Sequence, residues 1–486
     1  MHLKQGIMPL RLALRIGVPS ALLLAAVLFF CLPKGFALPV RVIPDAKRDQ
    51  YALTLVMHAE EGTVSLRETI AFVNRTGDFL EKTVLRFYLN AFAGADTAPV
   101  AQDAWEAAYP DGFSPGNVQL MGVFRNGEAL SCDFLDSECT SLSVPVGLQP
   151  GEACEISLNA VLTIPDMRGR CGRSADLWTL GNAIPMLALY DPETGGYRTD
   201  AYGPIGDPFL SECADFDVSV SVPDGWKPYG TAPFAEGKDG AFHAHAASVR
   251  DFLIVLARGM ESKKAVFGDM TVEALVPANA DVLPAAGNML KCFSDFFGPC
   301  PYPYLFIVAS DFPYGGMEYP GGVLLSKARF QDADGWELTL AHEIAHQWFY
   351  ALVLSDQVNA AWQDEAMAEY AVILYVKTIY GDASGERIQY QKALLPMEKS
   401  GVSVTPGAPI DLFPDLETYL NLVYGHGCAY LCALDTYLDG GLPAFLRAYL
   451  DAYAYGFATR ADFEEQLLFF SQTDLTALTA DYLDTY

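Results

Sequence analysis

The segment AHEIAHQWF, residues 341–349, carries two histidines four positions apart with a glutamate beside the first. Positions i and i+4 lie on one face of an α-helix, so the imidazoles of His342 and His346 can bind one tetrahedral ion. The carboxylate of Glu343 then lies close enough to take a proton from a water on that ion. This HExxH pattern predicts a zinc-binding helix inside a catalytic domain.

A second predicted helix supplies a third ligand. Glu365 follows His346 after eighteen intervening residues, in the segment NAAWQDEAMAEY (359–370). Three protein ligands leave the fourth position of a catalytic zinc open for water, so we expect His342, His346 and Glu365 to hold one Zn²⁺ ion. Glu369, one turn later, is either a hydrogen-bond partner of a ligand imidazole or a solvated residue of its helix.

A further motif precedes these two helices. Residues 315–319 read Gly-Gly-Met-Glu-Tyr and follow a predicted strand, YLFIVAS (304–310). Together with HExxH and the later glutamate, this segment resembles the GxMEN motif of the aminopeptidase N-like zinc metallopeptidases. WQDEAMAEY and DPFLSECADFDVSVSVP (207–223) are also similar to segments of that family, so the resemblance covers most of residues 50–486.

The resemblance implies how a peptide would be bound. Glu318 is expected to bind the free α-amine of the substrate. The backbone around Gly315, Gly316 and Met317 is expected to line an edge strand on which the substrate lies extended, because a residue without a Cβ permits close approach. Peptides with a free N-terminus are therefore the expected substrates.

The resemblance also implies the catalytic groups. Glu343 is expected to act as general base and then as general acid. Tyr424, in LVYGHGCAYL (422–431), matches the family's tyrosine that donates a hydrogen bond to the tetrahedral oxyanion. Two positions depart from the family pattern: Tyr319 replaces the Asn of the motif, and His426 stands where a Lys often follows the catalytic tyrosine. We assign His426 no role.

The order of patterns predicts a multidomain fold, β followed by α+β. Period-two alternation predicts an all-β domain over residues 51–264, and the resemblance implies a saddle-like shape for it. A thermolysin-like, mostly helical catalytic domain is expected over 265–486. Only 62 residues follow Tyr424, so we expect no large C-terminal helical domain. Helices are predicted over 280–297, 335–353, 360–380, 415–437 and 442–454.

Charge separates the N-terminal head from the rest. The whole chain of 486 residues has 31 basic and 60 acidic residues, a net charge of −29. Residues 1–50 contain seven bases and two acids (+5), which leaves 24 bases and 58 acids (−34) for residues 51–486. The strong negative charge of residues 51–486 argues against nucleic-acid binding, which requires a basic surface.

The head contains an uncharged apolar run of 17 residues, Ile16 to Leu32. This run indicates either a retained membrane anchor or a secretory signal cleaved near Ala37, while a buried soluble helix is the third interpretation. We expect residues 1–37 to be an anchor or signal, residues 38–50 to be a linker, and the catalytic domain to lie outside the cytoplasm. The expected location is the cell membrane, with one membrane-spanning segment, or the exterior after cleavage.

Nine cysteines follow Cys31, and an odd number cannot pair completely. Cys132 with Cys139 and Cys292 with Cys300 are candidate short bridges, and buried free thiols are the alternative.

The motifs together predict a zinc-dependent aminopeptidase that hydrolyses N-terminal residues by means of zinc-activated water. A membrane-tethered zinc endopeptidase is one alternative. A binding module with a vestigial metal site is the other.

Overall fold

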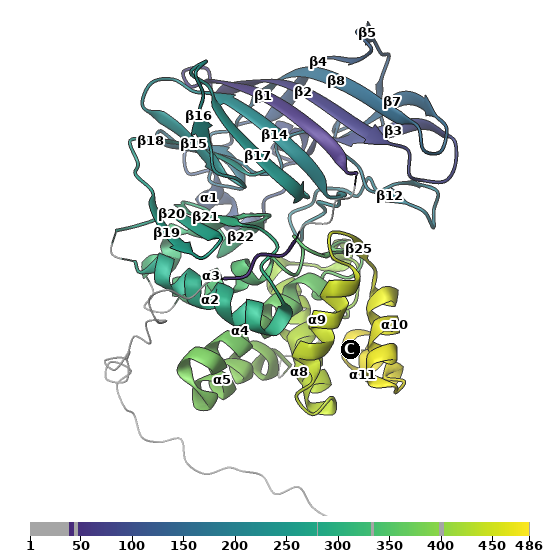
Figure 1. The fold of residues 1–486 in the computed structure, drawn as a ribbon, viewed down its shortest axis with the longest axis vertical. Helices are drawn as coiled ribbons and strands as arrows, with labels where there is room; N and C mark the ends of the chain where they lie inside the picture. The colour runs from purple at the N-terminus through teal and green to yellow at the C-terminus, as the bar shows by residue number, and fades with distance from the viewer. Residues whose placement is uncertain (1–37, 43–46, 279, 332–334, 398–402, 486) are drawn as a thin grey trace, which may run out of the picture. The chain divides into compact units, whose positions relative to one another are not determined.

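The computed structural model describes residues 38–42, 47–278, 280–331, 335–397 and 403–485. A part built of several sheets comes first along the chain, and a mostly helical part follows (Figure 1). The expected anchor or signal of residues 1–37 lies outside the described residues. Within the described ranges, no helix has both the length and the apolar character needed to cross a membrane.

The largest sheet has eight strands in the order β16-β17-β14-β1-β2-β8-β4-β5. β1 and β14 run parallel, and the other neighbouring strands run antiparallel. Alternate residues of β1 are buried, as the period-two pattern predicts for a sheet with one covered face. The strands are β1 (Asp49–His58), β2 (Thr63–Val73), β4 (Asn117–Arg125), β5 (Glu128–Ala129), β8 (Ala153–Thr163), β14 (Ala214–Ser221), β16 (Ala235–Glu236) and β17 (Phe242–Val249).

Two four-stranded sheets and one hairpin complete the first part. The sheets have the orders β15-β18-β10-β9 and β11-β3-β7-β6, and the hairpin joins β12 to β13. Their bounds are β3 (Leu80–Arg86), β6 (Asp133–Phe134), β7 (Ser141–Leu148), β9 (Cys171–Arg173), β10 (Leu177–Leu180), β11 (Met186–Leu187), β12 (Tyr190–Asp191), β13 (Gly196–Tyr197), β15 (Trp226–Gly230) and β18 (Ile254–Arg258). Short helices η1 (Tyr88–Ala93), η2 (Gln102–Ala104) and α1 (Trp105–Ala108) interrupt the strands.

The second part begins with a five-stranded sheet in the order β19-β20-β21-β23-β22. β21 (Tyr304–Ser310) is buried along its whole length, while β22 (Gly316–Tyr319) forms an edge, antiparallel to β23 (Gly322–Ser326). The expected domain boundary between residues 264 and 265 falls inside β19 (Lys263–Phe267), which pairs with β20 (Met270–Leu275).

Described residues of the expected linker bond to this second part. The backbone N–H of Leu38 donates to the carbonyl of Phe267 at 3.1 Å, and that of Arg41 donates to Cys300 at 2.7 Å. The guanidinium of Arg41 also pairs with Asp451 at 2.8 Å.

Helices α2 and α3 contact the five-stranded sheet, and α4 packs on both (Figure 1). The long helices are α2 (Val282–Phe297), α3 (Gly335–Ala345), α4 (Trp362–Tyr380), α5 (Asp382–Gln389), α8 (Gly427–Tyr437), α9 (Leu442–Ala452), α10 (Arg460–Ser471) and α11 (Thr476–Leu483). The short elements are η3 (Lys327–Gln331), α6 (Leu395–Met397), η5 (Ile410–Leu412), α7 (Leu416–Tyr419), the strand pair β24 (Leu354–Ser355) and β25 (Phe457–Ala458), and the π-helical η4 (Tyr390–Leu394) and η6 (Leu420–His426).

The predicted helix over 335–353 is too long, because α3 ends at Ala345. Beyond it, the N–H groups of Ala351 and Leu352 bond to carbonyls five residues back. Tyr350 has φ 109°, a value that no helical residue adopts. The apolar pattern continues through this turn because the turn is buried, so periodicity alone does not reveal the end of the helix.

Arg250 joins the two parts through their backbones. Its guanidinium is buried and donates to the carbonyls of Ser211 and Tyr350, each at 3.0 Å, and to those of Leu352 and Gly456. These bonds satisfy otherwise buried carbonyl groups on both sides of the interface.

All nine described cysteines are free. The two candidate bridges are therefore not formed, and seven of these thiols are buried like small apolar side chains.

Glu68 is an unexpected charge in the β core. It lies on β2 between Leu53 and Leu158 of the neighbouring strands, is fully buried, and neither of its carboxyl oxygens has a hydrogen-bond partner. Burial raises the pKa of this carboxyl well above its usual value, so it is neutral in the folded protein.

We predict that Glu68→Leu raises the free energy of unfolding by about 1–3 kcal/mol, because an unsatisfied buried polar group is removed. The folded protein keeps a proton that the unfolded chain releases above about pH 4, so the wild type loses stability as the pH rises. Thermal melts should show a larger gain for Glu68→Leu at pH 8 than at pH 4. Glu155→Leu, at an exposed position of β8, is the control. A melting temperature of Glu68→Leu below that of the wild type at pH 8 would contradict the prediction.

Candidate metal centre

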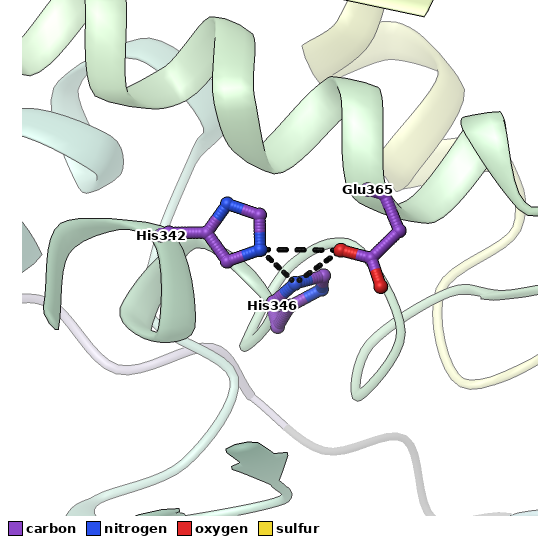
Figure 2. Close-up of side chains that lie close together, drawn as sticks. All are labelled: His342, His346 and Glu365. Atoms are coloured by element: carbon purple, nitrogen blue, oxygen red, sulfur yellow. Dashed lines mark hydrogen bonds and ion pairs between the residues drawn. The ribbon is translucent and has the colours of Figure 1, made fainter. Parts of the chain in front are cut away.

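Helices α3 and α4 bring the three predicted metal ligands together. The Nε2 atoms of His342 and His346 are 3.1 Å apart, and Oε2 of Glu365 lies 3.1 Å from the first and 3.4 Å from the second (Figure 2). All three side chains are buried. His342 lies in the last turn of α3 and His346 just beyond it, while Glu365 lies in the first turn of α4.

This triangle of donor atoms fits a zinc ion. Nitrogen and oxygen ligands about 2.0–2.1 Å from a tetrahedral ion lie roughly 3.3 Å from one another, which matches the three separations. The lone pairs of two imidazoles and one carboxylate converge at the centre of the triangle, and only protons or a cation can balance them. With three protein ligands, the fourth coordination position is left for water or substrate.

Two carboxylates fix the orientation of the imidazoles. Nδ1 of His346 donates to Oδ1 of Asp364 at 2.7 Å and to the carbonyl of Phe349 at 2.9 Å. Nδ1 of His342 lies 3.0 Å from Oε1 of Glu369. The hydrogen bonds of His346 place its ring proton on Nδ1 and leave Nε2 free to bind metal, and the carboxylate of Glu369 at ion-pair distance favours the same arrangement in His342. Of the two interpretations of Glu369, the structure therefore favours the partner of the ligand His342 over a solvated residue of the helix.

Sequence reasoning missed Asp364, although its position next to Glu365 was a usable signal. Gln357 donates a hydrogen bond to the second oxygen of Asp364. Sequence reasoning also missed Lys392, which pairs with Glu369 from η4. Burial disfavours the charged form of Glu369, but Lys392 and His342 together lower its pKa to about 2.

The predicted general base, Glu343, lies between the metal position and β22. An added Cβ at Gly316 would lie 2.7 Å from Cδ of Glu343, so only a glycine lets the strand approach this carboxyl so closely. Burial raises the pKa of Glu343 to about 7, although His342 and His346 favour its ionised form. A group that titrates near neutral pH can both accept and return a proton.

Glu318 reaches the same place from β22. Its carboxyl oxygen, one from Glu343 and a nitrogen of His346 all lie within 4.8 Å of one another. Burial raises the pKa of Glu318 well above its usual value, so this carboxyl requires a cationic partner to ionise. Met317, the neighbouring residue, packs into a hydrophobic cluster with Tyr229 and Phe306.

Tyr319, which replaces the motif's Asn, is accommodated by the β domain. Its ring is buried, and its hydroxyl lies 3.4 Å from Oδ1 of Asn182. An added Cβ at Gly181 would collide with this hydroxyl, so the glycine provides the space that the larger side chain needs.

Tyr424 lies beside two of the metal ligands, His342 and Glu365. It belongs to the π-helix η6, and its ring stacks on that of His342 with centroids 5.6 Å apart. Burial, followed by the charge of Glu365, raises the pKa of Tyr424 well above its usual value, so the phenol remains a hydrogen-bond donor. His426 contacts the carbonyl of Pro396 at 3.3 Å.

The β domain also contributes a partly buried ion pair near the site. Nη2 of Arg170 lies 2.5 Å from Oδ1 of Asp207, and the guanidinium is 4.7 Å from the ring centroid of Phe209. The charge of Asp207 acts on Glu318 and on Glu343. Asp207 opens the segment DPFLSECADFDVSVSVP, so the sequence already contained a signal for it.

Residues 283–482 match the sequence profile of the peptidase family M1 domain. The chain carries an M1 peptidase domain. It is 30% identical over 207 residues to aminopeptidase M1-B of Oryza sativa subsp. japonica, covering 37% of this chain and 22% of that protein. It is 26% identical over 289 residues to aminopeptidase B of Rattus norvegicus, covering 54% and 43%. The chain thus spans less than half the length of these curated relatives.

The M1 fold extends over the described part of the chain. The crystal structure of an M1 zinc metallopeptidase from Deinococcus radiodurans superposes with a TM-score of 0.64 at 17% identity, covering 92% of this chain and 93% of that one. The expected order of a multi-sheet domain followed by a helical domain is confirmed. The M1 family implies one catalytic Zn²⁺, and the donor triangle fits that ion.

We predict that Asp364→Asn weakens zinc binding about tenfold, because loss of the carboxylate makes His346 a weaker and less constrained ligand. Competition with a chromophoric chelator measures the change. Asp295→Asn, at an exposed position of α2, should bind zinc as the wild type does. Equal affinities for Asp364→Asn and wild type would contradict the role of Asp364.

Zinc binding should also depend on pH. Burial opposes protonation of His342, but hydrogen bonds with Glu365 and Glu369 raise its pKa in the metal-free protein to about 9. Because zinc binds the unprotonated ring, each displaced proton should lower zinc affinity about tenfold per pH unit below this pKa. Chelator competition between pH 6 and 9 measures the slope, and a flat profile would exclude proton competition at this imidazole.

Proposed function

We propose that this protein is a zinc aminopeptidase that removes N-terminal residues from peptides. The observation that carries the proposal is the carboxyl of Glu318, buried beside the metal triangle and close to Glu343. A free α-ammonium is the partner that would let this carboxyl ionise. Anchored there, the first residue of a peptide would hold its carbonyl at the metal position, so that cleavage releases one residue.

The remaining residues supply the groups that peptide hydrolysis needs. A zinc ion held by His342, His346 and Glu365 would supply Lewis acidity at this place. The carboxylate of Glu343 accepts a proton from the attacking water as its oxygen bonds to the carbonyl carbon, and it delivers that proton to the nitrogen of the leaving amine as the C–N bond breaks. The hydroxyl of Tyr424 donates a hydrogen bond to the carbonyl oxygen as negative charge develops on it.

The free edge of β22 suits an extended peptide. Its N–H and C=O groups are paired with β23 on one side only, so a peptide strand can pair on the other. Gly316 holds this edge close to Glu343, which aligns the peptide with the general base.

We also propose that the catalytic domain acts outside the cytoplasm. This part of the proposal rests on the uncharged apolar run of residues 16–32 and on the basic head around it.

A hydrolysis panel tests the activity. Coumarin amides of single amino acids with a free amine should be cleaved, their N-acetylated forms should not, and a zinc chelator should abolish the reaction. Glu343→Gln should lower kcat by about 10²–10⁴-fold while zinc content stays that of the wild type, because only proton transfer is lost. Glu386→Gln, at an exposed position of α5, is the matched control.

Three outcomes would reject the proposal. Cleavage of N-blocked peptides without cleavage of free-amine substrates would indicate a zinc endopeptidase. Full activity in Glu343→Gln would reject the mechanism. The absence of both zinc and hydrolysis in the wild type would favour a binding module.

A further inference from the structure

An arginine lies beside the first glycine of the substrate strand. An added Cβ at Gly315 would be 3.2 Å from Nη2 and 3.5 Å from Nε of Arg329, and 3.5 Å from Cγ2 of Thr339. The guanidinium thus occupies the space that a side chain at position 315 would fill. One edge of its planar group, Nε and Nη2, faces the strand.

The backbone holds Arg329 in this place. β23 ends at Ser326, whose N–H donates to the carbonyl of Gly315 at 3.0 Å. The hydroxyl of Ser326 then accepts from the N–H of Ala328 at 3.3 Å, and η3 turns the chain back over the start of β22. These hydrogen bonds hold the backbone that leads to Arg329 close to Gly315.

The charge of Arg329 has no partner within the part of the chain that the structure describes: neither a hydrogen bond nor an ion pair involves its side chain. Its neighbour Lys327 differs, because the ammonium pairs with Asp311 at 3.0 Å. In a chain with 60 acidic and 31 basic residues, an exposed and unpaired guanidinium beside the active site is a distinct electrostatic feature.

The location of Arg329 corresponds to the leaving-group side of the cleft. Thr339 and Glu343 are one turn apart on α3, and they face Gly315 and Gly316 respectively. Glu318 lies three residues farther along the strand than Gly315, or about 10 Å at the rise of an extended chain. A peptide anchored by its amine at Glu318 therefore reaches this end of the strand with its second or third residue.

We propose that Arg329 binds a carboxylate on the leaving-group side of the scissile bond and makes the enzyme selective for substrates that carry one there. The carboxylate is the free C-terminus of a di- or tripeptide or an acidic side chain. The guanidinium matches the planar geometry of a carboxylate and keeps its charge at all physiological pH values. This inference rests on the proposed aminopeptidase function.

Paired substrates test the proposal. One pair is a tripeptide ending in Gly-Gly, as the free acid and as the C-terminal amide, and it begins with the residue preferred in the coumarin panel. The second pair is a tripeptide amide with Glu or Gln in the second position. We expect the wild type to favour the carboxylate in at least one pair by about five- to tenfold in kcat/KM, and less at high salt.

Arg329→Gln should reduce that preference to about one, and Arg329→Lys should restore part of it. Lys327→Gln is the matched control and should keep the wild-type preference, because Lys327 is already neutralised by Asp311. A preference in the first pair alone assigns the site to chain termini, and one in the second pair alone assigns it to acidic side chains.

The absence of any preference in the wild type, or an unchanged preference in Arg329→Gln, overturns the inference. Hydrolysis of the coumarin amides, which have no carboxylate on the leaving-group side, tests the aminopeptidase function separately. If the coumarin amides are cleaved but neither substrate pair shows a preference for the carboxylate, the role of Arg329 is rejected and the aminopeptidase function stands.

Discussion

The arrangement of the catalytic domain depends on how buried negative charge is balanced between α3 and α4. The carboxyls of Glu318, Glu343 and Glu365 are all buried around the imidazoles of His342 and His346. Without a metal, the imidazoles can offset this charge only by binding protons. A divalent cation replaces those protons, lets the imidazoles act as neutral ligands, and favours ionisation of the neighbouring carboxyls. Folding of this region and metal binding are therefore coupled.

The sequence was enough to predict the residues that would bind the metal, but it revealed few of the residues that hold those ligands in place. The three ligands follow from the spacing of His342, His346 and Glu365, because a helix converts spacing into a shared face. Asp364 and Lys392 orient or neutralise these groups. The only sequence signal for Asp364 was its position next to Glu365, and Lys392 had none. The alternation of the β domain was likewise readable, whereas its pairing order was not, because strand order depends on contacts between distant segments.

Irregular helical segments explain why the periodicity of the sequence did not predict the local structure around several residues of the site. Tyr424 and Lys392 both belong to π-helical segments, in which one extra residue per turn rotates the following side chains out of the α-helical register. Such segments have no reliable sequence signal and frequently occur at functional sites. The turn that ends α3 after Ala345 has the same character, with bonds to carbonyls five residues back. Each of these irregular segments carries or adjoins a residue at the metal centre.

The contact between Tyr319 and Gly181 links two domains that meet at the active site. A motif residue has changed to a larger one, and the space for it comes from a glycine far away in the sequence. Position 181 therefore cannot change freely: an added Cβ there would lie 1.9 Å from the hydroxyl oxygen of Tyr319 and 2.8 Å from the backbone carbonyl oxygen of Arg170. Among related proteins, a tyrosine at the last position of the motif should therefore be accompanied by glycine at the position equivalent to 181.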